Sequence, residues 1–457
     1  MANWDVIVIG GGNAALVAAL SASDEGAKVL LLERAERPFR GGNTRHTRCI
    51  RSVQAGADDY VTGAYTEDEL YADIVDVTHG GCDPDQTRLL VNESRSLPQW
   101  MWDHGVRWQK PMRGTLHLTR TNRFFLGGGK AMVNAYHQTA ASRDITVRYA
   151  AEVTALEMTG TRCTGVVIRE NGAETVERGT AVVVASGGFE ANLPWMREYW
   201  GEAADNFVVR GTPLNDGSVL KMLLAHGAVA HGDPKRFHSI AVDARAPKFD
   251  GGIATRLDAV PLSITVNRHA KRFYDEGEDI WPKRYAIWGR LIAEEDGQIA
   301  YAIVDSQAVK DFMPSMYPPI KAETIEALAA ETGLDRGALA ATIAEYNAAV
   351  VTGTFDLSKP DDCRTEGITP PKSHWARRIE EAPFYAYPLR PGITFTYHGV
   401  RVDRDARVLT ETGAFDNVFA AGEIMAGTIL SRGYLAGLGL TIGSVFGRIA
   451  GRSAAHA

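Results

Sequence analysis

The sequence contains little cysteine, and the few cysteines are widely spaced. Four are present in the 457 residues, and no two form a C-x-x-C pair: Cys49, Cys82, Cys163 and Cys363. Structural zinc sites, iron–sulfur clusters and redox dithiols usually need closely spaced cysteines. We therefore expect no metal site, and any redox chemistry must come from a bound organic cofactor.

Positive charge is not in excess either, and long apolar runs are missing. Lys and Arg number 49 against 56 Asp and Glu, a net charge of -7. Nucleic-acid-binding proteins usually carry a basic domain or stripe, so we expect no nucleic-acid partner. Residues 435–451 are apolar but glycine-rich, which is too short and broken for a membrane span. Because no basic leader precedes the apolar N-terminal run, we expect a cytoplasmic protein.

Glycine is abundant, and the most informative glycines follow the first apolar run, residues 6–9. Gly10 predicts a tight turn, and Gly12 predicts a close approach of the backbone to a pyrophosphate. Asn13 and Ala14 follow in the same turn, and Ala15 replaces the third glycine of the pattern. A helix over 16–22 would then place its N-terminus against a phosphate. A purely structural glycine turn is the alternative.

A second apolar strand, residues 28–32, ends at Glu33. Its distance from the glycine turn, about 20 residues, suits an acid that accepts hydrogen bonds from a ribose hydroxyl. Arg34 follows directly. Strand, glycine turn and acid together predict a dinucleotide site.

Hydrophobic patterns along the chain predict an interrupted domain. Alternating runs within 147–186 indicate strands, and the periods of 325–332 and 336–351 indicate helices. We expect an α/β, Rossmann-like dinucleotide-binding domain with an inserted α+β capping domain. The expected segments are 1–238 for its first part, 239–360 for the cap and 361–457 for its second part.

Further motifs carry a family resemblance. They are Gly41-Gly42-Asn43-Thr44, residues 182–189 with Asn192, Asn215-Asp216-Gly217, residues 419–423 and residues 446–451. With the glycine turn, they resemble the flavoprotein family of fumarate reductase and succinate dehydrogenase. The resemblance implies an FAD-binding domain, a cap, and hydride transfer between the flavin and a carbon next to a carboxylate or ketone.

Within that family, residues 272–279, 283–285 and 431–439 most resemble the tricarballylate dehydrogenases. The implied reaction is oxidation of propane-1,2,3-tricarboxylate to cis-aconitate. The alternatives are a fumarate-reductase-like or ketosteroid-type C=C oxidoreductase, or a flavin subunit of a larger assembly. The resemblance also implies a membrane-associated iron–sulfur protein as electron acceptor, which would bring the chain to the inner membrane as a peripheral protein.

The resemblance, together with the glycine turn, assigns the FAD contacts. They are Gly10, Gly12, Asn13, Ala14, Ala15, Glu33, Arg34, Gly41, Gly42, Asn43, Thr44, Val153, Ser186, Gly187, Gly188, Asp216, Gly422, Glu423, Gly437, Leu438, Gly439 and Leu440. Membrane-bound relatives attach FAD through a histidine that aligns with Asn43 rather than with His46. We therefore expect non-covalent FAD. Close helix packing is the alternative explanation of the late glycines.

Family members exchange a proton with the substrate through an arginine that follows a motif found here at 271–273. At the distance from this motif that is usual in the family, this sequence has Ile280, and Arg284 is the nearest arginine that could take the same role. Because the free pKa of arginine exceeds about 12, Arg284 would need burial or a relay to Glu276 or Glu278. The alternative is that Arg284 only binds a carboxylate.

Two further anchors of the family are shifted here. The histidine of fumarate reductases aligns with Phe395, three residues before His398, and their second arginine aligns with Tyr434, two residues after Arg432. We expect His398 and Arg432 to hold carboxylates of a tricarboxylate, because arginine forks match carboxylates best. Arg123 and His117 are further candidates. His398 could instead be a core histidine.

Overall fold

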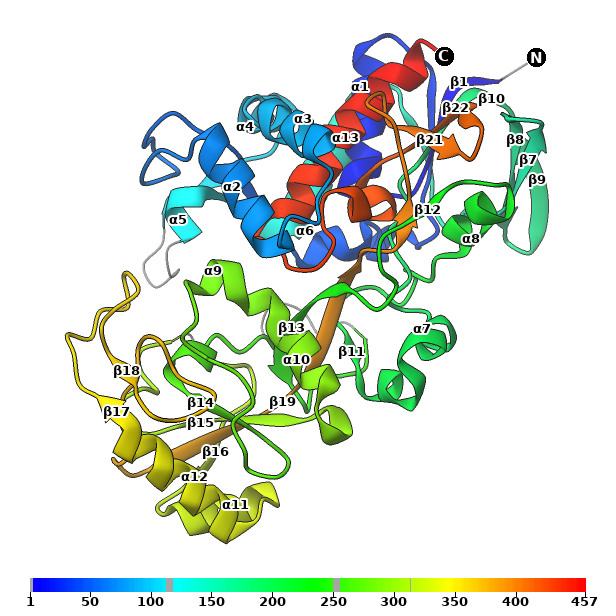
Figure 1. Ribbon diagram of the computed structural model, residues 1–457. Helices are drawn as coiled ribbons and strands as arrows, with labels where there is room; N and C mark the ends of the chain where they lie inside the picture. Colours follow the sequence, from blue (N-terminus) through cyan, green and yellow to red (C-terminus); the bar gives the residue numbers. More distant parts are fainter. Residues whose placement is uncertain (1–2, 112–117, 250–254, 313) are drawn as a thin grey trace.

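The computed structural model describes residues 3–111, 118–249, 255–312 and 314–457. The chain forms two parts, each around its own sheet, with both termini on the first part (Figure 1). His117 falls outside the described residues.

A six-stranded sheet forms the first part. In spatial order its strands are β21 (Arg407–Thr410), β22 (Gly413–Ala420), β10 (Gly179–Val184), β1 (Trp4–Ile9), β2 (Val29–Leu32) and β6 (Thr146–Arg148). All neighbours are parallel except the β21–β22 hairpin. Ile7 in β1 lies opposite Val182 and Leu30. The central strands are apolar throughout because helices and loops cover both faces of such a sheet.

Helices α1 (Asn13–Asp24) and α13 (Leu438–Ala455) pack along each other although they come from opposite ends of the chain (Figure 1). Glycines allow the close contact: a Cβ on Gly447 would lie 2.7 Å from the carbonyl oxygen of Ala14, and one on Gly451 would lie 2.3 Å from that of Ala18. Gly447 and Gly451 therefore serve helix packing. No helix among the described residues is both long and apolar enough to cross a membrane.

Shorter elements complete the first part. The helices are α2 (Glu67–Thr78), α3 (Pro84–Ser94), α4 (Leu97–Asp103), α5 (Leu118–Thr121), α6 (Gly128–Ser142) and α8 (Ser218–Ala225). Helix α7 (Leu193–Trp200) lies at the junction with the second part, where Trp200 packs against Phe237 (Figure 1). The small sheets are β3 (Cys49–Arg51) with β5 (Asn122–Phe125) and β4 (Trp108–Gln109), then β7 (Glu152–Thr159) with β8 (Arg162–Glu170) and β9 (Ala173–Glu177), and the pair β12 (Ala230–His231) with β20 (Gly399–Val400).

The second sheet is organised by one long strand, β19 (Phe384–Thr396). The others are β11 (Val208–Val209), β13 (Phe237–Asp243), β14 (Ile264–Asn267), β15 (Ala300–Val304) and β16 (Ile320–Ala322). Four of them, β11, β13, β15 and β16, pair directly with β19. Its last residues reach the junction with the first part (Figure 1).

Helices α9 (Trp281–Arg284), α10 (Trp288–Glu294), α11 (Ile325–Thr332) and α12 (Arg336–Ala349), with the pair β17 (Val350–Val351) and β18 (Arg364–Thr365), complete the second part. The α/β class and the Rossmann-like sheet are confirmed. The strands of the second sheet extend beyond the predicted cap, 239–360, because β11 precedes it and β19 follows it. Sequence patterns mark strands but not their distant partners, so this pairing was not visible from the sequence.

Candidate functional site

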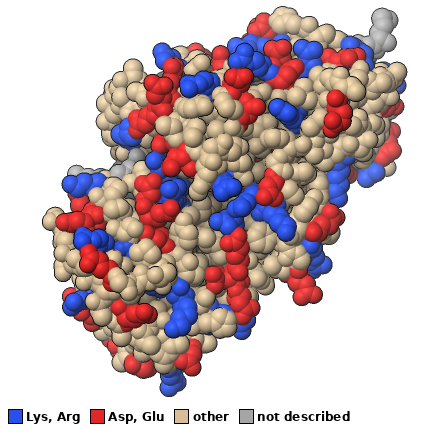
Figure 2. Space-filling model, viewed as in Figure 1, with Lys and Arg blue, Asp and Glu red and all other residues tan. Residues whose placement is uncertain are grey.

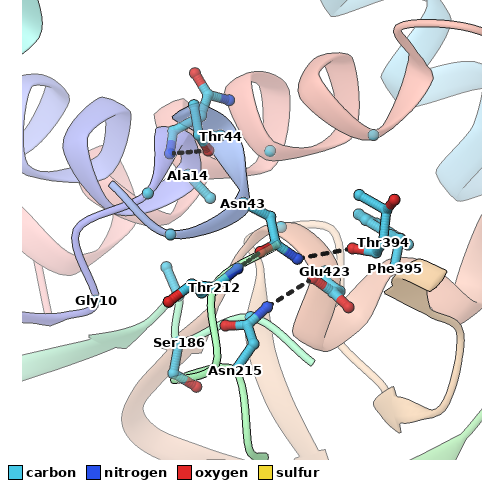
Figure 3. Close-up of a pocket in the computed structure, with 18 of the residues that line it drawn as sticks. Gly10, Ala14, Asn43, Thr44, Ser186, Thr212, Asn215, Thr394, Phe395 and Glu423 are labelled. Carbon is cyan, nitrogen blue, oxygen red and sulfur yellow. Dashed lines mark hydrogen bonds between the residues drawn. The ribbon is translucent and has the colours of Figure 1, made fainter. Parts of the chain in front are cut away.

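A long cavity begins at the glycine turn between β1 and α1. Gly10 has a φ of 118°, and a Cβ there would lie 2.3 Å from the carbonyl oxygen of Ala185, so only glycine fits. Gly12 precedes α1, whose first N–H groups have no carbonyl partner within the helix. The N–H of Asn13 donates to Thr44 Oγ1 over 2.9 Å (Figure 3). The cavity thus starts at a helix N-terminus that suits an anionic group.

Glu33 lies at the end of β2 on the cavity wall and is buried. Its Oε1 accepts a hydrogen bond from the N–H of Ala35 (2.8 Å), and its Oε2 accepts one from that of Gly41 (3.2 Å). Burial raises the pKa of the Glu33 carboxyl although these bonds act to lower it. Arg34 pairs with Asp216, which also lines the cavity, over 2.6 Å. Glu33 therefore lies at the position from which an acidic residue binds the ribose of a dinucleotide.

Asn43 connects three segments in the middle of the cavity (Figure 3). Its Nδ2 donates to Glu190 Oε1 (2.5 Å) and to the carbonyl oxygen of Thr394 (2.8 Å). Its Oδ1 accepts the N–H of Thr212 (2.9 Å). Asn43 comes from the short 3-10 helix Gly42–His46, so it joins the first part of the molecule to the end of β19.

Two buried carboxyl groups, those of Glu190 and Glu423, hydrogen-bond to each other beside Asn43. Asn215 Nδ2 donates to both (2.8 and 3.4 Å), and the N–H of Thr396 donates to Glu423 (2.8 Å). Burial raises the pKa of both, and the neighbouring carboxyl raises that of Glu423 further. In the described part of the chain no Lys or Arg pairs with either. Both carboxyl groups therefore keep their protons to a higher pH than an exposed glutamate does.

The start of α13 also lines the cavity. Gly437 precedes the helix with a φ of 84°, and the N–H of Gly439 donates to Tyr434 Oη over 2.9 Å. Asn13 Nδ2 donates to the carbonyl oxygen of Leu440 (3.2 Å), which ties α13 to α1. The cavity thus has a second helix N-terminus, which favours negative charge.

Basic and aromatic side chains gather at the end of the cavity near Tyr434. They are Arg48, Arg210, Arg256, His238, Tyr285 and Phe395. Arg210 Nη1 donates to Thr394 Oγ1 (3.0 Å), and Arg256 pairs with Asp258 (2.5 Å). The Arg48 guanidinium makes no hydrogen bond or ion pair with the residues that the structure describes, and it lies over the ring of Phe124, 6.0 Å from its centroid. A partly buried arginine without such a partner indicates a binding site for an anionic ligand.

Burial and mutual repulsion shift the pKa values in this cluster. Burial, and then the charge of Arg256, lowers the pKa of Arg48 and brings that of Arg210 to about 10. Burial and the charges of Arg210 and Arg256 hold the pKa of His238 well below its usual 6.5, so the imidazole is neutral. Burial raises the pKa of Tyr285 to about 12. His238 Nε2 lies 3.3 Å from Tyr285 Oη, in hydrogen-bond contact.

Most of the predicted cofactor residues line this single cavity. They are Gly10, Gly12, Asn13, Ala14, Glu33, Arg34, Gly42, Asn43, Thr44, Val153, Ser186, Gly187, Asp216, Gly422, Glu423, Gly437, Gly439 and Leu440. The other four lie directly behind the wall. Ala15 and Leu438 are fully buried, Gly41 donates to Glu33, and Gly188 is in contact with Glu423.

The structure places the four predicted catalytic residues outside this cavity. Arg284 and Arg432 line a second pocket. His398 Nδ1 contacts the carbonyl oxygen of Gly232 (3.0 Å), and its ring lies edge-on to Phe189.

Glu276, the fourth, has a fully buried side chain that pairs with Arg272 (2.6 Å) and accepts the N–H of Thr265 (2.7 Å). Arg123, a further candidate, is paired with Asp58 (2.5 Å). Both side chains therefore already have a charged partner within the protein.

Sequence reasoning did not single out His238, Arg210 or Arg256 as site residues, because they are isolated in the sequence and carry no motif. Arg48 is one of four arginines within residues 40–51, the others being Arg40, Arg45 and Arg51. Tyr434 was noted only as the replacement of an arginine. Tyr285 adjoins the predicted Arg284. The short helices at 281–287 turn Tyr285 toward the cavity and leave Arg284 against Glu278 (3.1 Å).

The described residues contain no group of three or more His, Cys, Asp or Glu side chains that could hold a metal ion. The cavity instead fits a dinucleotide: two helix N-termini face it, one buried acid stands at the end of β2, and the Gly10 turn leaves room for no side chain. These are the features of a site that takes a pyrophosphate and a ribose.

Comparison with known proteins agrees with this geometry. The sequence matches the family described as FAD binding domain over residues 5–439. It is 27% identical to the NADH:fumarate oxidoreductase of Klebsiella pneumoniae (strain 342), covering 99% of this chain and 48% of that protein. It is 25% identical to the NADH:acrylate oxidoreductase of Vibrio harveyi, covering 98% and 50%. The chain thus spans about half the length of these two relatives.

A third relative is closer in length. The probable fumarate reductase Ifc3 of Shewanella frigidimarina (strain NCIMB 400) is 27% identical, covering 98% of this chain and 74% of that protein.

Two solved structures share the fold. The open conformation of a flavocytochrome c3 fumarate reductase superimposes with a TM-score of 0.74 at 23% identity, covering 99% of this chain and 78% of that one. The 3-ketosteroid-Δ4-(5α)-dehydrogenase of Rhodococcus jostii RHA1 does so with a TM-score of 0.74 at 24% identity, covering 99% and 96%. The chain therefore belongs to the FAD binding domain family, whose cofactor is FAD.

Proposed function

We propose that this protein is an FAD-dependent oxidoreductase that converts tricarballylate to cis-aconitate. The observation that carries the proposal is the convergence of Arg48, Arg210 and Arg256 at one end of the cavity. A tricarboxylate carries about three negative charges near neutral pH, and guanidinium forks are the best protein partners of carboxylates. Arg48, which has no partner among the described residues, would receive one of them.

FAD would occupy the rest of the cavity. We assign its adenosine end to Glu33 and the turn at Gly10 and Gly12, and its isoalloxazine to the region between Asn43 and Gly439. When bound, FAD supplies a hydride acceptor at N5 strong enough for an unactivated C–H bond. No histidine stands at position 43, which supports non-covalent binding, and Asn43 is engaged in hydrogen bonds.

Tyr285 and His238 replace Arg284 in the proposed proton transfer. Both line the cavity and are in hydrogen-bond contact, whereas Arg284 lies outside it. The neutral imidazole of His238 accepts the phenol proton while Tyr285 Oη takes the proton from the substrate. Burial and the charges of Arg210 and Arg256 keep His238 neutral in the resting state, so its Nε2 has a lone pair that can receive the phenol proton.

The reverse reaction, reduction of the C=C bond of an unsaturated polycarboxylate, is the second candidate. One observation favours it: burial raises the pKa of Tyr285 to about 12, so the resting phenol carries the proton that the substrate carbon would receive. Relatives named as fumarate reductases support the same chemistry class.

We also propose a separate electron acceptor, an iron–sulfur protein associated with the inner membrane, to reoxidise the flavin. The relatives include proteins named as a cytochrome-type fumarate reductase and as NADH:fumarate oxidoreductase, so members of this family exchange electrons with different carriers. A pull-down of the tagged chain from membranes, followed by metal analysis of the captured protein, tests this proposal.

The test of the reaction is flavin reduction in the absence of oxygen. Tricarballylate added to FAD-loaded protein should bleach the visible flavin band, and succinate, citrate and a ketosteroid should not. Bleaching by succinate alone, or by none of the acids, would reject the proposed substrate. If reduced protein is reoxidised by cis-aconitate faster than oxidised protein is bleached by tricarballylate, the reductase direction is favoured.

A further inference from the structure

A second cavity, of about 160 Å³, lies at the junction of the two parts of the molecule and shares no lining residue with the flavin cavity. Basic side chains dominate its lining: His79, Arg236, Lys283, Arg284, Arg290 and Arg432. The single acidic residue in that lining is Glu278. On the face shown in Figure 2, basic side chains are visible at the waist between the two parts, with acidic ones beside them.

Both parts of the molecule contribute to this pocket. His79 follows α2, and Arg432 lies in the loop before α13, so these two belong to the first part. Arg284 ends α9, and Arg290 lies within α10, so these belong to the second part. A ligand in the pocket would therefore contact both parts at once.

Only a thin wall separates the pocket from the flavin cavity. Phe237, Arg284 and Gly433 line the pocket, whereas the residues that follow them, His238, Tyr285 and Tyr434, line the flavin cavity. In β13 this alternation follows from the strand, since successive side chains point to opposite faces. The pocket thus adjoins the end of the flavin cavity that holds the arginine cluster.

Many of the donors in this pocket are not used by the protein. Arg432 is exposed and makes no ion pair or hydrogen bond with any residue the structure describes. Arg284 contacts Glu278 through Nε (3.1 Å), while its Nη2 is 3.8 Å from Asp279, beyond hydrogen-bond distance. A guanidinium has five N–H donors, so several remain for a ligand.

The remaining basic side chains of the pocket differ in their ion pairs with neighbouring acidic residues. Arg236 Nε is 3.5 Å from Asp233, and Arg290 pairs with Glu294 through Nη1 (2.5 Å). Lys283 bridges to Asp73 of α2 (3.0 Å), which makes it a link between the two parts. Arg236, Arg284, Arg290 and Arg432 are therefore the side chains with donors to offer.

We propose that this pocket, centred on Arg284 and Arg432, is a second binding site for a compact polycarboxylate, which it holds between the two parts of the molecule before entry to the flavin cavity. The proposal rests on the proposed function for the choice of ligand. Planar, bidentate guanidinium groups match carboxylates. An anion bound in this pocket would lie next to the flavin cavity, where we propose that it reacts.

Citrate is the probe, because its central carbon has no hydrogen and it cannot be desaturated as tricarballylate can. Calorimetric titration of the FAD-loaded protein should show two binding events, of which one leaves the flavin absorption spectrum unchanged. Arg432→Ala should weaken that spectrally silent event about tenfold, the loss of one charge-assisted hydrogen bond. Arg404→Ala is the matched control, since Arg404 is exposed, has no ion pair among the described residues and lies outside both cavities.

Arg48→Ala should show the opposite pattern, with loss of the event that perturbs the flavin spectrum and retention of the silent one. A single binding event in the wild type, or a silent event that Arg432→Ala leaves unchanged, would overturn the second site. Inorganic phosphate that competes as strongly as citrate would overturn its assignment to polycarboxylates. Arg432-dependent citrate binding without any bleaching by tricarballylate would reject the proposed function and leave the second site in place.

Discussion

His238 Nε2 lies 3.3 Å from Tyr285 Oη; His238 comes from strand β13, and Tyr285 begins the 3-10 helix Tyr285–Ile287. The ring of His238 also lies 4.0 Å from that of Tyr434. Burial and the charges of Arg210 and Arg256 lower the pKa of the imidazole, so an unprotonated ring nitrogen is held next to a phenol inside a positively charged pocket. This arrangement determines the first prediction.

Replacing Tyr285 by Phe should slow flavin reduction by tricarballylate about 10²- to 10³-fold, because the group that exchanges the substrate proton is lost. FAD affinity should stay the same. Stopped-flow bleaching of the flavin band measures the rate. The control is Tyr301→Phe, a partly buried tyrosine of β15 outside the cavity. Equal rates for Tyr285→Phe and the wild type would remove Tyr285 from the mechanism.

Replacing Arg48 by Ala should weaken substrate binding about ten- to hundredfold, the usual range for hydrogen bonds between charged partners. The stability of the substrate-free protein should barely change, since Arg48 makes no ion pair or hydrogen bond with the described residues. The Kd from flavin difference spectra tests the expected loss of substrate binding, and the Tm of the same samples tests the expected stability. A large drop in Tm would mean that Arg48 has a structural role.

Replacing Gly10 by Ala should abolish FAD binding and lower stability by about 2 kcal/mol or more. The added Cβ would lie 2.3 Å from the carbonyl oxygen of Ala185, and φ is 118°. Gly56→Ala is the control, since nothing lies within 4 Å of a Cβ there and its φ is not positive. Urea unfolding and FAD titration of both variants measure the effects; a stable, FAD-loaded Gly10→Ala protein would contradict the prediction.

The Glu190–Glu423 pair should make stability fall as pH rises. Both carboxyl groups have folded-state pKa values above their ordinary 4.5, so the folded protein binds more protons than the unfolded one. Their contribution is complete below pH 4.5 and is lost as pH rises through the raised pKa of the pair.

Urea unfolding of FAD-free protein at a series of pH values measures how the free energy of unfolding changes with pH. Glu423→Gln removes one titrating group, keeps the shape of the side chain and should make this free energy depend less on pH. Asp416→Asn, an exposed acid of β22, should leave this pH dependence unchanged. A wild-type stability independent of pH above 4.5 would show that the pair does not retain its proton.

The cofactor site could be predicted from the sequence because its signals are local. Gly10, Gly12 and Glu33 owe their roles to one strand–turn–helix unit and the strand after it, and such a unit has the same geometry wherever it occurs. Most of the FAD contacts drawn from the family resemblance also line one cavity. Helices 325–332 and 336–349 were visible for the same reason, since their periodicity lies within a single element.

The reactive end of the cavity could not be predicted in this way, because its residues meet only through long-range pairing. β13 carries His238 beside the end of β19, which pairs with four other strands and delivers Thr394 and Phe395 to the cavity. Neighbouring residues line different cavities. Tyr285 lines the flavin cavity, whereas Arg284 lines the second pocket, and in the same way Tyr434 lines the flavin cavity and Gly433 the second pocket. Composition and motifs determined the family, the nucleotide-binding turn and the class of chemistry. Tertiary structure alone decided which side chains face the substrate, because the direction of a side chain depends on how its strand or helix packs against distant ones.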